Sequence, residues 1–263
     1  MARNRILWGV LKIEGTLECL TGLHVGSGPD GMELGGVSAQ VVKHPLTYEP
    51  YVPGTSIRGR LRALLEKSLV MESGDGTSAL SANYQADGEG RIFIHACKSF
   101  DPSAPMCPLC RLFGSPGAYP SAVIVRDAKL LGGDIRRDSL IVYEVKTESV
   151  LDRLTGASIP RAVERVPAGA RFSFELVYRA ESFAADVDVA AGPSAEDRQR
   201  FKEDLLNIKK ALKLLELEGL GAHTSRGYGQ VKVGISGVEW TKAAGEFSLK
   251  EEAEGVFLKP SEE

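Results

Sequence analysis

Four residues in the middle of the chain carry side chains that bind soft metal ions. His95 and Cys97 fall in a short apolar run, and Cys107 and Cys110 follow as a Cys-Pro-Leu-Cys knuckle. Residues two apart in an extended strand share a face, so His95 and Cys97 point the same way. One imidazole and three thiolates form the complete ligand set of a closed tetrahedral zinc site. The sequence therefore predicts a structural Zn site, with four unliganded residues in a reduced loop as the alternative.

The same pattern argues against a catalytic zinc. A zinc deaminase places a glutamate two residues after the histidine and leaves one metal position to water. Here Cys97 stands at that position, and all four ligand positions are supplied by protein. We interpret the metal as a clamp on an insertion with little apolar core of its own. A zinc-dependent hydrolase, inactivated by chelation while its fold survives, is the competing hypothesis.

A second group of residues that could bind a ligand lies at the start of a predicted helix. Thr55 or Ser56 is expected to cap this helix. Arg58, Arg60 and Arg62 occupy its first two turns. Cations there oppose the helix dipole by about 0.3 to 1 kcal/mol each. An anion such as phosphate docked at this end would turn that cost into a gain. We therefore expect a phosphate contact, the alternative being that the arginines are only solvated.

The segment 219–229 contains four glycines in eleven residues, together with Ser225, Arg226 and Tyr228. Glycines let the backbone approach another chain closely and offer its amides to anions. Gly219 falls where the preceding helix should end, because glycine enters positive φ without strain. The sequence favours an anion-binding loop here, and a flexible turn is the simpler alternative.

These residues are positioned by elements that alternate between strand and helix. Apolar residues recur at helical spacing over 57–69 and 201–215, and at strand spacing over 11–19, 172–178 and 231–235. A hairpin with its tip near Gly156 separates the two halves. The order strand, helix, strands, hairpin, strand, helix, strand predicts an α+β chain with a ferredoxin-like (RRM-like) β-α-β-β-α-β core. After Trp240 the periodicity is lost, so residues 241–263 are predicted to be a peripheral tail.

Composition narrows the class of protein. The net charge is −3, with 43% hydrophobic and 25% charged residues, which is ordinary for a soluble globular chain. Any RNA surface must therefore be local. The apolar run near the start is broken too early by Lys12 and Glu14 for a signal peptide, and nothing approaches membrane-spanning length. We expect a cytoplasmic protein with no membrane partner.

Several motifs, in order along residues 8–236, together resemble one family. They are Thr21-Gly22-Leu23-His24-Val25-Gly26, Leu34-Gly35-Gly36-Val37, Pro53-Gly54-Thr55-Ser56-Ile57-Arg58-Gly59-Arg60-Leu61-Arg62, Cys110-Arg111-Leu112-Phe113-Gly114, Arg126-Asp127-Ala128, the stretch from Asp152-Arg153 to Glu164-Arg165, and Leu214-Leu215-Glu216-Leu217 running into 219–229. The chain resembles the backbone subunit of type III CRISPR effector complexes, of the Csm kind, within the RAMP superfamily.

The resemblance implies a right-hand-like architecture and a role in antiviral defence. Residues 1–240 would form a palm with two insertions, a zinc-bearing finger at about 72–120 and a thumb hairpin at about 145–165. Copies of the subunit would stack into a helical filament along a guide CRISPR RNA, beside other type III subunits. Each thumb would insert into the duplex between the guide and a target single-stranded RNA and displace one nucleotide at a regular interval.

The resemblance also implies which residues contact RNA. Such contacts would be directed at the backbone, because base pairing between the RNAs reads the sequence. The expected set is His24, Lys43, Ser56, Arg58, Arg60, Arg62, Arg153, Arg161, Ser225, Arg226 and Tyr228.

The chain departs from the family at the cleavage step. An aspartate that supports metal-dependent cutting usually follows the Leu34–Val37 motif, where this chain has Ser38. A serine supplies no carboxylate to draw in Mg²⁺. We therefore expect weak or absent cleavage of target RNA. Two alternatives stay open: an active Mg²⁺-dependent endoribonuclease using Asp30 or Glu33, and a guide-RNA processing ribonuclease with His24 or His223 as the candidate general base.

Overall fold

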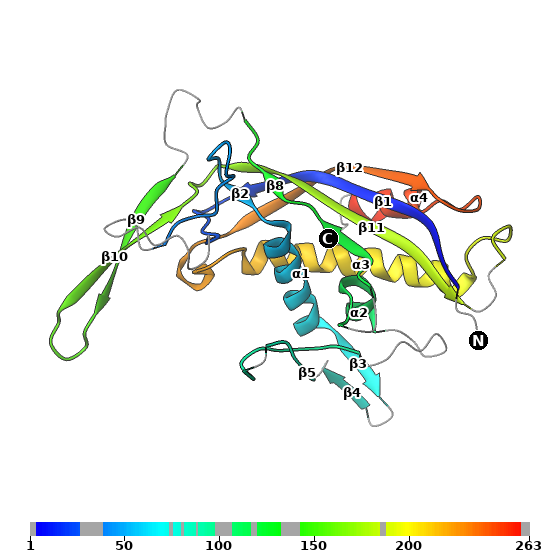
Figure 1. Ribbon diagram of the computed structural model, residues 1–263, viewed down its shortest axis with the longest axis horizontal. Helices are drawn as coiled ribbons and strands as arrows, with labels where there is room; N and C mark the ends of the chain where they lie inside the picture. Colours follow the sequence, from blue (N-terminus) through cyan, green and yellow to red (C-terminus); the bar gives the residue numbers. More distant parts are fainter. Residues whose placement is uncertain are drawn as a thin grey trace.

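The computed structural model describes residues 4–26, 39–73, 76–79, 82–87, 89–97, 107–116, 120–132, 143–184 and 188–258. Its centre is an antiparallel four-stranded sheet in the order β12-β1-β11-β7 (Figure 1). The strands are β1 (Asn4–Cys19), β7 (Val123–Val125), β11 (Arg171–Ala184) and β12 (Val231–Lys242). The sheet thus joins the first long strand of the chain to the last two.

Strand β1 lies between β11 and β12 along most of its length. Its alternating residues Leu11, Ile13 and Leu17 are fully buried, as the period-two pattern predicts. The pairing with β11 shifts by one residue between Leu7 and Gly9. At this bulge Trp8 is buried, and its indole Nε1 donates to Ser182 Oγ at 2.7 Å.

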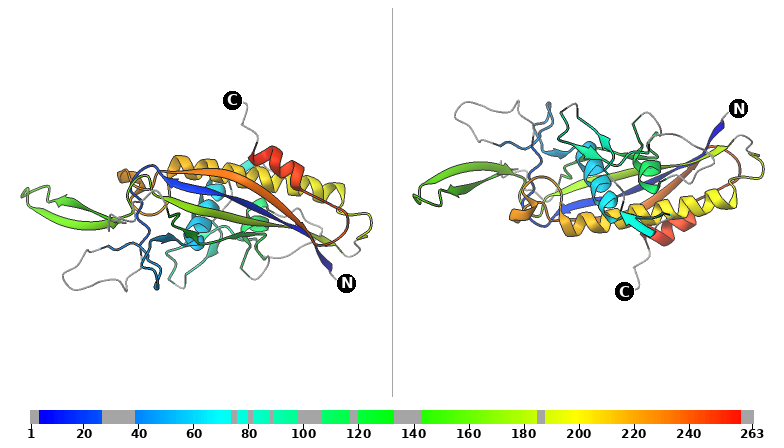
Figure 2. Two further views of the ribbon diagram at one scale, coloured as in Figure 1. Left: turned by 90° about the horizontal axis from the view of Figure 1, so that it is seen from above. Right: turned by 90° about the horizontal axis from the view of Figure 1, so that it is seen from below.

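Two helices, α1 (Gly54–Ser68) and α3 (Ala195–Glu218), pack on one face of this sheet (Figures 1 and 2). The predicted apolar stripes of both helices are confirmed, because they meet in one core. From α1 and α3 this core takes Ile57, Leu61, Leu64, Leu65, Phe201, Leu205, Ile208, Leu212 and Leu215. Ser194 caps α3 with its hydroxyl, which accepts from the Asp197 amide at 3.1 Å.

The start of α1 differs from the expectation. The N-cap residue is Pro53, and neither Thr55 nor Ser56 caps the helix with its side chain. Instead Asp127 Oδ1 accepts from the Gly54 amide at 2.7 Å. A Cβ on Gly54 would lie 2.3 Å from the Val125 carbonyl oxygen, so only glycine allows this approach. The cap comes from 73 residues away, which is why local sequence rules missed it.

Short elements complete this side of the molecule. They are β2 (Tyr51–Val52), which pairs with β8 (Ala128–Lys129), β3 (Val70–Ser73) with β4 (Gly76–Ala79), and β5 (Tyr84–Gln85) with β6 (Phe93–Ile94). Helix α2 (Pro108–Phe113) is tied to α3 by a buried ion pair, in which Arg111 Nη2 lies 2.6 Å from Asp204 Oδ1. Tyr178 also donates to Asp204, at 2.8 Å.

The segment after Trp240 is more regular than we expected. Strand β12 continues to Lys242, and α4 (Lys250–Phe257) follows. Phe247, Leu249 and Ala253 are buried in the main core, and the Phe247 ring stands edge-on to Trp240 at 5.8 Å. Three inward residues are too few to produce a readable helical period, which explains the miss. Among the described residues, no helix combines the length and apolar character needed to span a bilayer.

Candidate nucleic-acid interface and metal centre

The predicted hairpin is present and projects from the body of the molecule (Figures 1 and 2). It consists of β9 (Glu144–Leu151) and β10 (Ser158–Arg165), paired in register throughout. Asp152 Oδ1 closes the tip by accepting from the amides of Leu154 and Thr155 at 2.8 and 2.9 Å. This turn leaves the Leu154 side chain 96% exposed.

The glycine-rich segment is a packed arc and not a loose turn. The backbone amide of Gly229 donates to the Gly22 carbonyl at 2.9 Å, and Ala222 donates to the His24 carbonyl at the same distance. A Cβ on Gly221 would lie 2.3 Å from the His24 carbonyl oxygen. The short helix η2 (Thr224–Arg226) forms the outer part of the arc. Glycine is therefore required here by close backbone packing and positive φ.

A groove of about 1000 Å³ lies between the hairpin and the arc. Arg153 and Arg161 reach it from the hairpin, and His223 and Arg226 from the arc. All three arginines are exposed, with Arg226 retaining 63% of its side-chain surface. Ser225 is exposed beside Arg226. The structure thus brings together three of the residues expected to contact RNA, Arg153, Arg161 and Arg226, from two segments far apart in the sequence.

Tyr228 is buried and supports the groove from within the protein. It is 2% exposed, and Lys146 Nζ and Arg165 Cζ lie 4.7 and 4.9 Å from its ring centroid. These cation–π contacts join the base of the hairpin to the arc. Tyr228 was expected to contact the RNA backbone, but its burial leaves little of the side chain accessible to RNA.

His24 and Lys43 are engaged within the protein as well. His24 is 5% exposed, and its Nδ1 lies 2.6 Å from the Glu164 carbonyl oxygen, which only accepts, so Nδ1 carries a proton. Lys43 donates to Glu164 Oε1 at 2.9 Å and lies over the Tyr143 ring. His24, Lys43 and Glu164 thus hold the segment around Val41 against β10, and the RNA contacts of His24 and Lys43 stay predictions. With the proton on Nδ1, Nε2 is the basic nitrogen of His24, and its use as a general base stays an alternative prediction.

The α1 arginines were expected to hold phosphate, but each is bonded to backbone carbonyls. Arg58 donates to the Phe113 carbonyl, and Arg62 to those of Gly114 at 2.9 Å and His95 at 2.8 Å. These bonds supply positive charge at the C-terminal end of α2, where it is favourable. Burial and the nearby Arg62 charge lower the pKa of Arg58.

Arg60 likewise places positive charge at the C-terminal end of α3. It donates to the carbonyls of Gly219 and Glu218 at 2.9 and 3.1 Å, at the end of α3. The N-terminus of α1 is already occupied by the Asp127 carboxylate. Ser56 lies in that first turn, half-buried. A phosphate at the α1 N-terminus would therefore meet a carboxylate, which removes the physical reason we gave for this contact.

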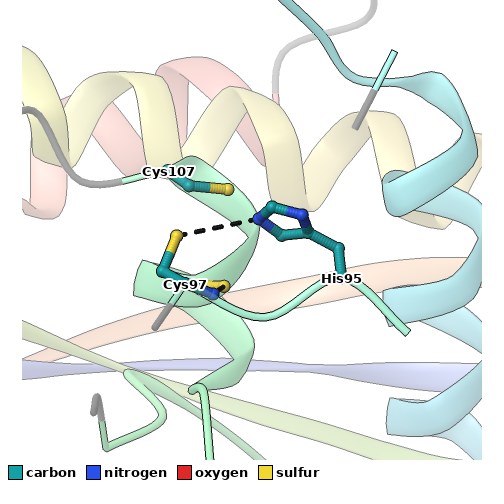
Figure 3. Close-up of side chains that lie close together, drawn as sticks. His95, Cys97 and Cys107 are labelled. Atoms are coloured by element: carbon teal, nitrogen blue, oxygen red, sulfur yellow. Dashed lines mark hydrogen bonds between the residues drawn. The ribbon is translucent and has the colours of Figure 1, made fainter. Parts of the chain in front are cut away.

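The four predicted metal ligands converge, and Figure 3 shows three of them, His95, Cys97 and Cys107, close together. Their ligand atoms all lie within 4.8 Å of one another, and His95 Nε2 is 3.7 Å from Cys97 Sγ. Tetrahedral zinc with ordinary bond lengths separates N and S ligands by about 3.6 Å. The Cys97 amide donates to Cys110 Sγ at 3.3 Å, and a hydrogen bond from Cys107 lowers the pKa of the Cys110 thiol. The donor set and spacing therefore fit a metal.

Helix α1 holds this cluster from outside. Glu66 Oε1 accepts from the His95 amide at 2.8 Å, and Arg62 donates to the His95 carbonyl. Ser115 donates to the Cys97 carbonyl at 2.7 Å. Such second contacts fix ligand orientation. They join distant segments, so no local sequence pattern predicts them.

The profile of the RAMP superfamily matches residues 16–232. This chain belongs to the RAMP superfamily. It is 37% identical over 227 residues to the CRISPR system Cms endoribonuclease Csm3 of Mycobacterium tuberculosis, which covers 84% of this chain and 85% of the relative. The identity to Csm3 of Methanocaldococcus jannaschii is 32% over 236 residues, covering 87% and 80%. Within the RAMP superfamily the chain is thus Csm3-like.

A solved RAMP structure shares the mixed α+β fold. The crystal structure of Methanopyrus kandleri Csm3 superposes with a TM-score of 0.56 at 24% identity, covering 89% of this chain and 78% of the other. Ser38, Asp30 and Glu33, on which the expectations about cleavage rest, lie outside the described residues.

Proposed function

We propose that this chain is the guide-RNA-binding backbone subunit of a type III CRISPR interference complex. In this proposal residues 1–240 form a ferredoxin-like palm, about 72–120 a finger and about 145–165 a thumb. The strand order β12-β1-β11-β7, with α1 and α3 as crossovers, supports the palm. Other copies of the chain, other type III subunits and the target RNA are the proposed partners.

The groove between hairpin and arc is the observation that carries the proposal. Its three exposed arginines are free to exchange their contacts for phosphate, unlike the arginines of α1. Arg153 and Arg161 stand on a projecting hairpin, and Arg226 stands on the rigid arc that faces it. A local basic groove of this kind reconciles RNA binding with a net charge of −3.

The proposal includes weak or absent cutting of target RNA by this chain. The relatives are named endoribonucleases, whereas Ser38 here stands where the resemblance places the aspartate. Ala39, the next residue in the sequence, lines the groove and bridges to Val163 of the hairpin. Mg²⁺ would be needed only if the chain cuts, whereas the His95 cluster would hold a structural Zn²⁺.

RNA binding is tested by changing the groove one arginine at a time. The full chain should bind labelled single-stranded RNA with an affinity that falls with salt. Arg161→Ala and Arg226→Ala should each lower the slope of log affinity against log salt by about 0.7, the value for one lost phosphate contact on a single strand. Fluorescence anisotropy over a salt series measures this slope.

The matched control is Arg91→Ala, which removes the same charge from an exposed site outside the groove. It should leave the slope unchanged. Equal effects of all three variants, or no salt-sensitive binding by the unaltered chain, would refute the proposed groove.

A further inference from the structure

One carboxylate stands among the cations of the groove. Of the described residues that line it, only Glu148 is acidic. Its Oε2 lies 3.4 Å from Arg226 Nη1, across the gap between hairpin and arc. On the hairpin itself Glu148 is directly opposite Arg161, so the two side chains share a face of the ribbon. An anionic group of the protein therefore occupies the space between two proposed phosphate contacts.

The Arg226 guanidinium is held from a second side by His223. The distance from Nη1 to His223 Nδ1 is 3.3 Å. Because a guanidinium only donates, Nδ1 accepts and the imidazole proton resides on Nε2. His223 has a φ of 62°, a left-handed conformation that non-glycine residues rarely adopt and that is typically kept at functional sites. The arc thus presents Arg226 to the groove in a fixed orientation.

Glu148 is ionised at neutral pH in this setting. The Tyr228 hydroxyl lowers the pKa of Glu148, with further contributions from the charges of Lys146 and Arg226. Its Oε1 lies 3.6 Å from Lys146 Nζ. The pair with Arg226 remains partly exposed, and such pairs are weak. A ligand with a stronger charge-assisted bond can therefore replace the carboxylate.

We propose that Glu148 occupies the position of one RNA backbone phosphate in the RNA-free chain, and that RNA must displace it to reach Arg226 and Arg161. Carboxylate and phosphate oxygens both match the guanidinium fork, so the exchange preserves the geometry of Arg226. Glu148 keeps the hairpin joined to the arc before loading and lowers affinity for isolated anions. This inference rests on the proposed function and adds a competitor within the same groove.

The test is Glu148→Gln, which removes the charge and keeps the shape. The full-length variant should bind the labelled single-stranded RNA about two- to fivefold more tightly than the unaltered chain at moderate salt, because the competing pair is lost. The gain should shrink when Arg226→Ala is added, since the two residues act on each other. The matched control is Glu175→Gln, whose carboxylate also lies 3.4 Å from an arginine, Arg126, outside the groove.

Three results would count against the inference in distinguishable ways. Unchanged or weaker binding by Glu148→Gln, while Arg226→Ala and Arg161→Ala still weaken binding, would overturn the inference alone. An equal gain from Glu175→Gln would show a general charge effect and also overturn it. If the unaltered chain shows no salt-sensitive binding and the arginine variants change nothing, the proposed function fails together with the inference.

Discussion

At the residue scale, Asp204 is a carboxylate buried in the core. It is 1% exposed, accepts a hydrogen bond from Tyr178 and pairs with Arg111 of α2. Burial raises the pKa of Asp204, against the opposing charge of Arg111. The neighbouring Glu203 also reaches Arg111, at 3.0 Å, but its side chain is 48% exposed. The two carboxylates therefore pair with the same arginine, one exposed to solvent and the other buried.

We predict that Asp204→Asn lowers the free energy of unfolding by about 3 kcal/mol, because it leaves the buried Arg111 charge without its main partner. Glu203→Gln, the matched control, should cost less than about 1 kcal/mol, since solvent screens an exposed pair. Urea unfolding followed by tryptophan fluorescence compares the two. Similar losses for both variants would contradict this account of the ion pair.

The residue scale also separates what the sequence could predict from what it could not. The ligand cluster was predictable, because His95 and Cys97 are two apart and Cys107 and Cys110 three apart. The role of Arg60 was not, because its carbonyl partners lie 158 and 159 residues away. An arginine near a helix start has the same sequence pattern whether it binds phosphate or a distant carbonyl.

At the scale of elements, the hairpin and both long helices followed from periodicity and turn residues. The arc and the α1 cap did not, because each depends on two segments meeting. Segment 22–24 packs against Ala222 and Gly229, and Asp127 meets Gly54. The metal cluster was predictable in part: its ligands are close in sequence, but the α1 residues that support them are not.

Removal of the metal should act on one element and spare the sheet. We predict that a strong chelator releases one equivalent of zinc and raises amide hydrogen exchange in residues 89–97 and 107–116. Release should be easier in mild acid, because protonation of the thiolates and the imidazole competes with the metal. Strands β1 and β11 serve as the internal control and should keep their protection. Intact protection near the cluster after full zinc release would contradict a structural role.

At the scale of the whole molecule, the proposed loss of cutting can be tested only in the assembled complex. We predict that Ser38→Asp gains or strengthens Mg²⁺-dependent cleavage of bound target RNA at regular intervals, because it restores the missing carboxylate. Gel analysis of labelled target measures the products. Ser225→Asp, which adds the same charge at an exposed position beside the groove, is the control and should produce no cutting.

No gain in cutting by Ser38→Asp would argue that the missing aspartate does not explain the chain's behaviour. Cleavage by the unaltered complex at the same intervals would instead favour Asp30 or Glu33 as the active carboxylate.

The central place of β1 has a consequence for how the protein is made. β1 is synthesised before both of its neighbours, which begin at Arg171 and Val231. A ribosome must therefore translate the whole stretch from β1 to β11 before either edge of β1 can be paired, and open strand edges are sites of aggregation. Pairings so distant in sequence also slow folding. The nascent chain should thus depend on chaperones, or on early capture by its companions, more than a protein of this size with local contacts.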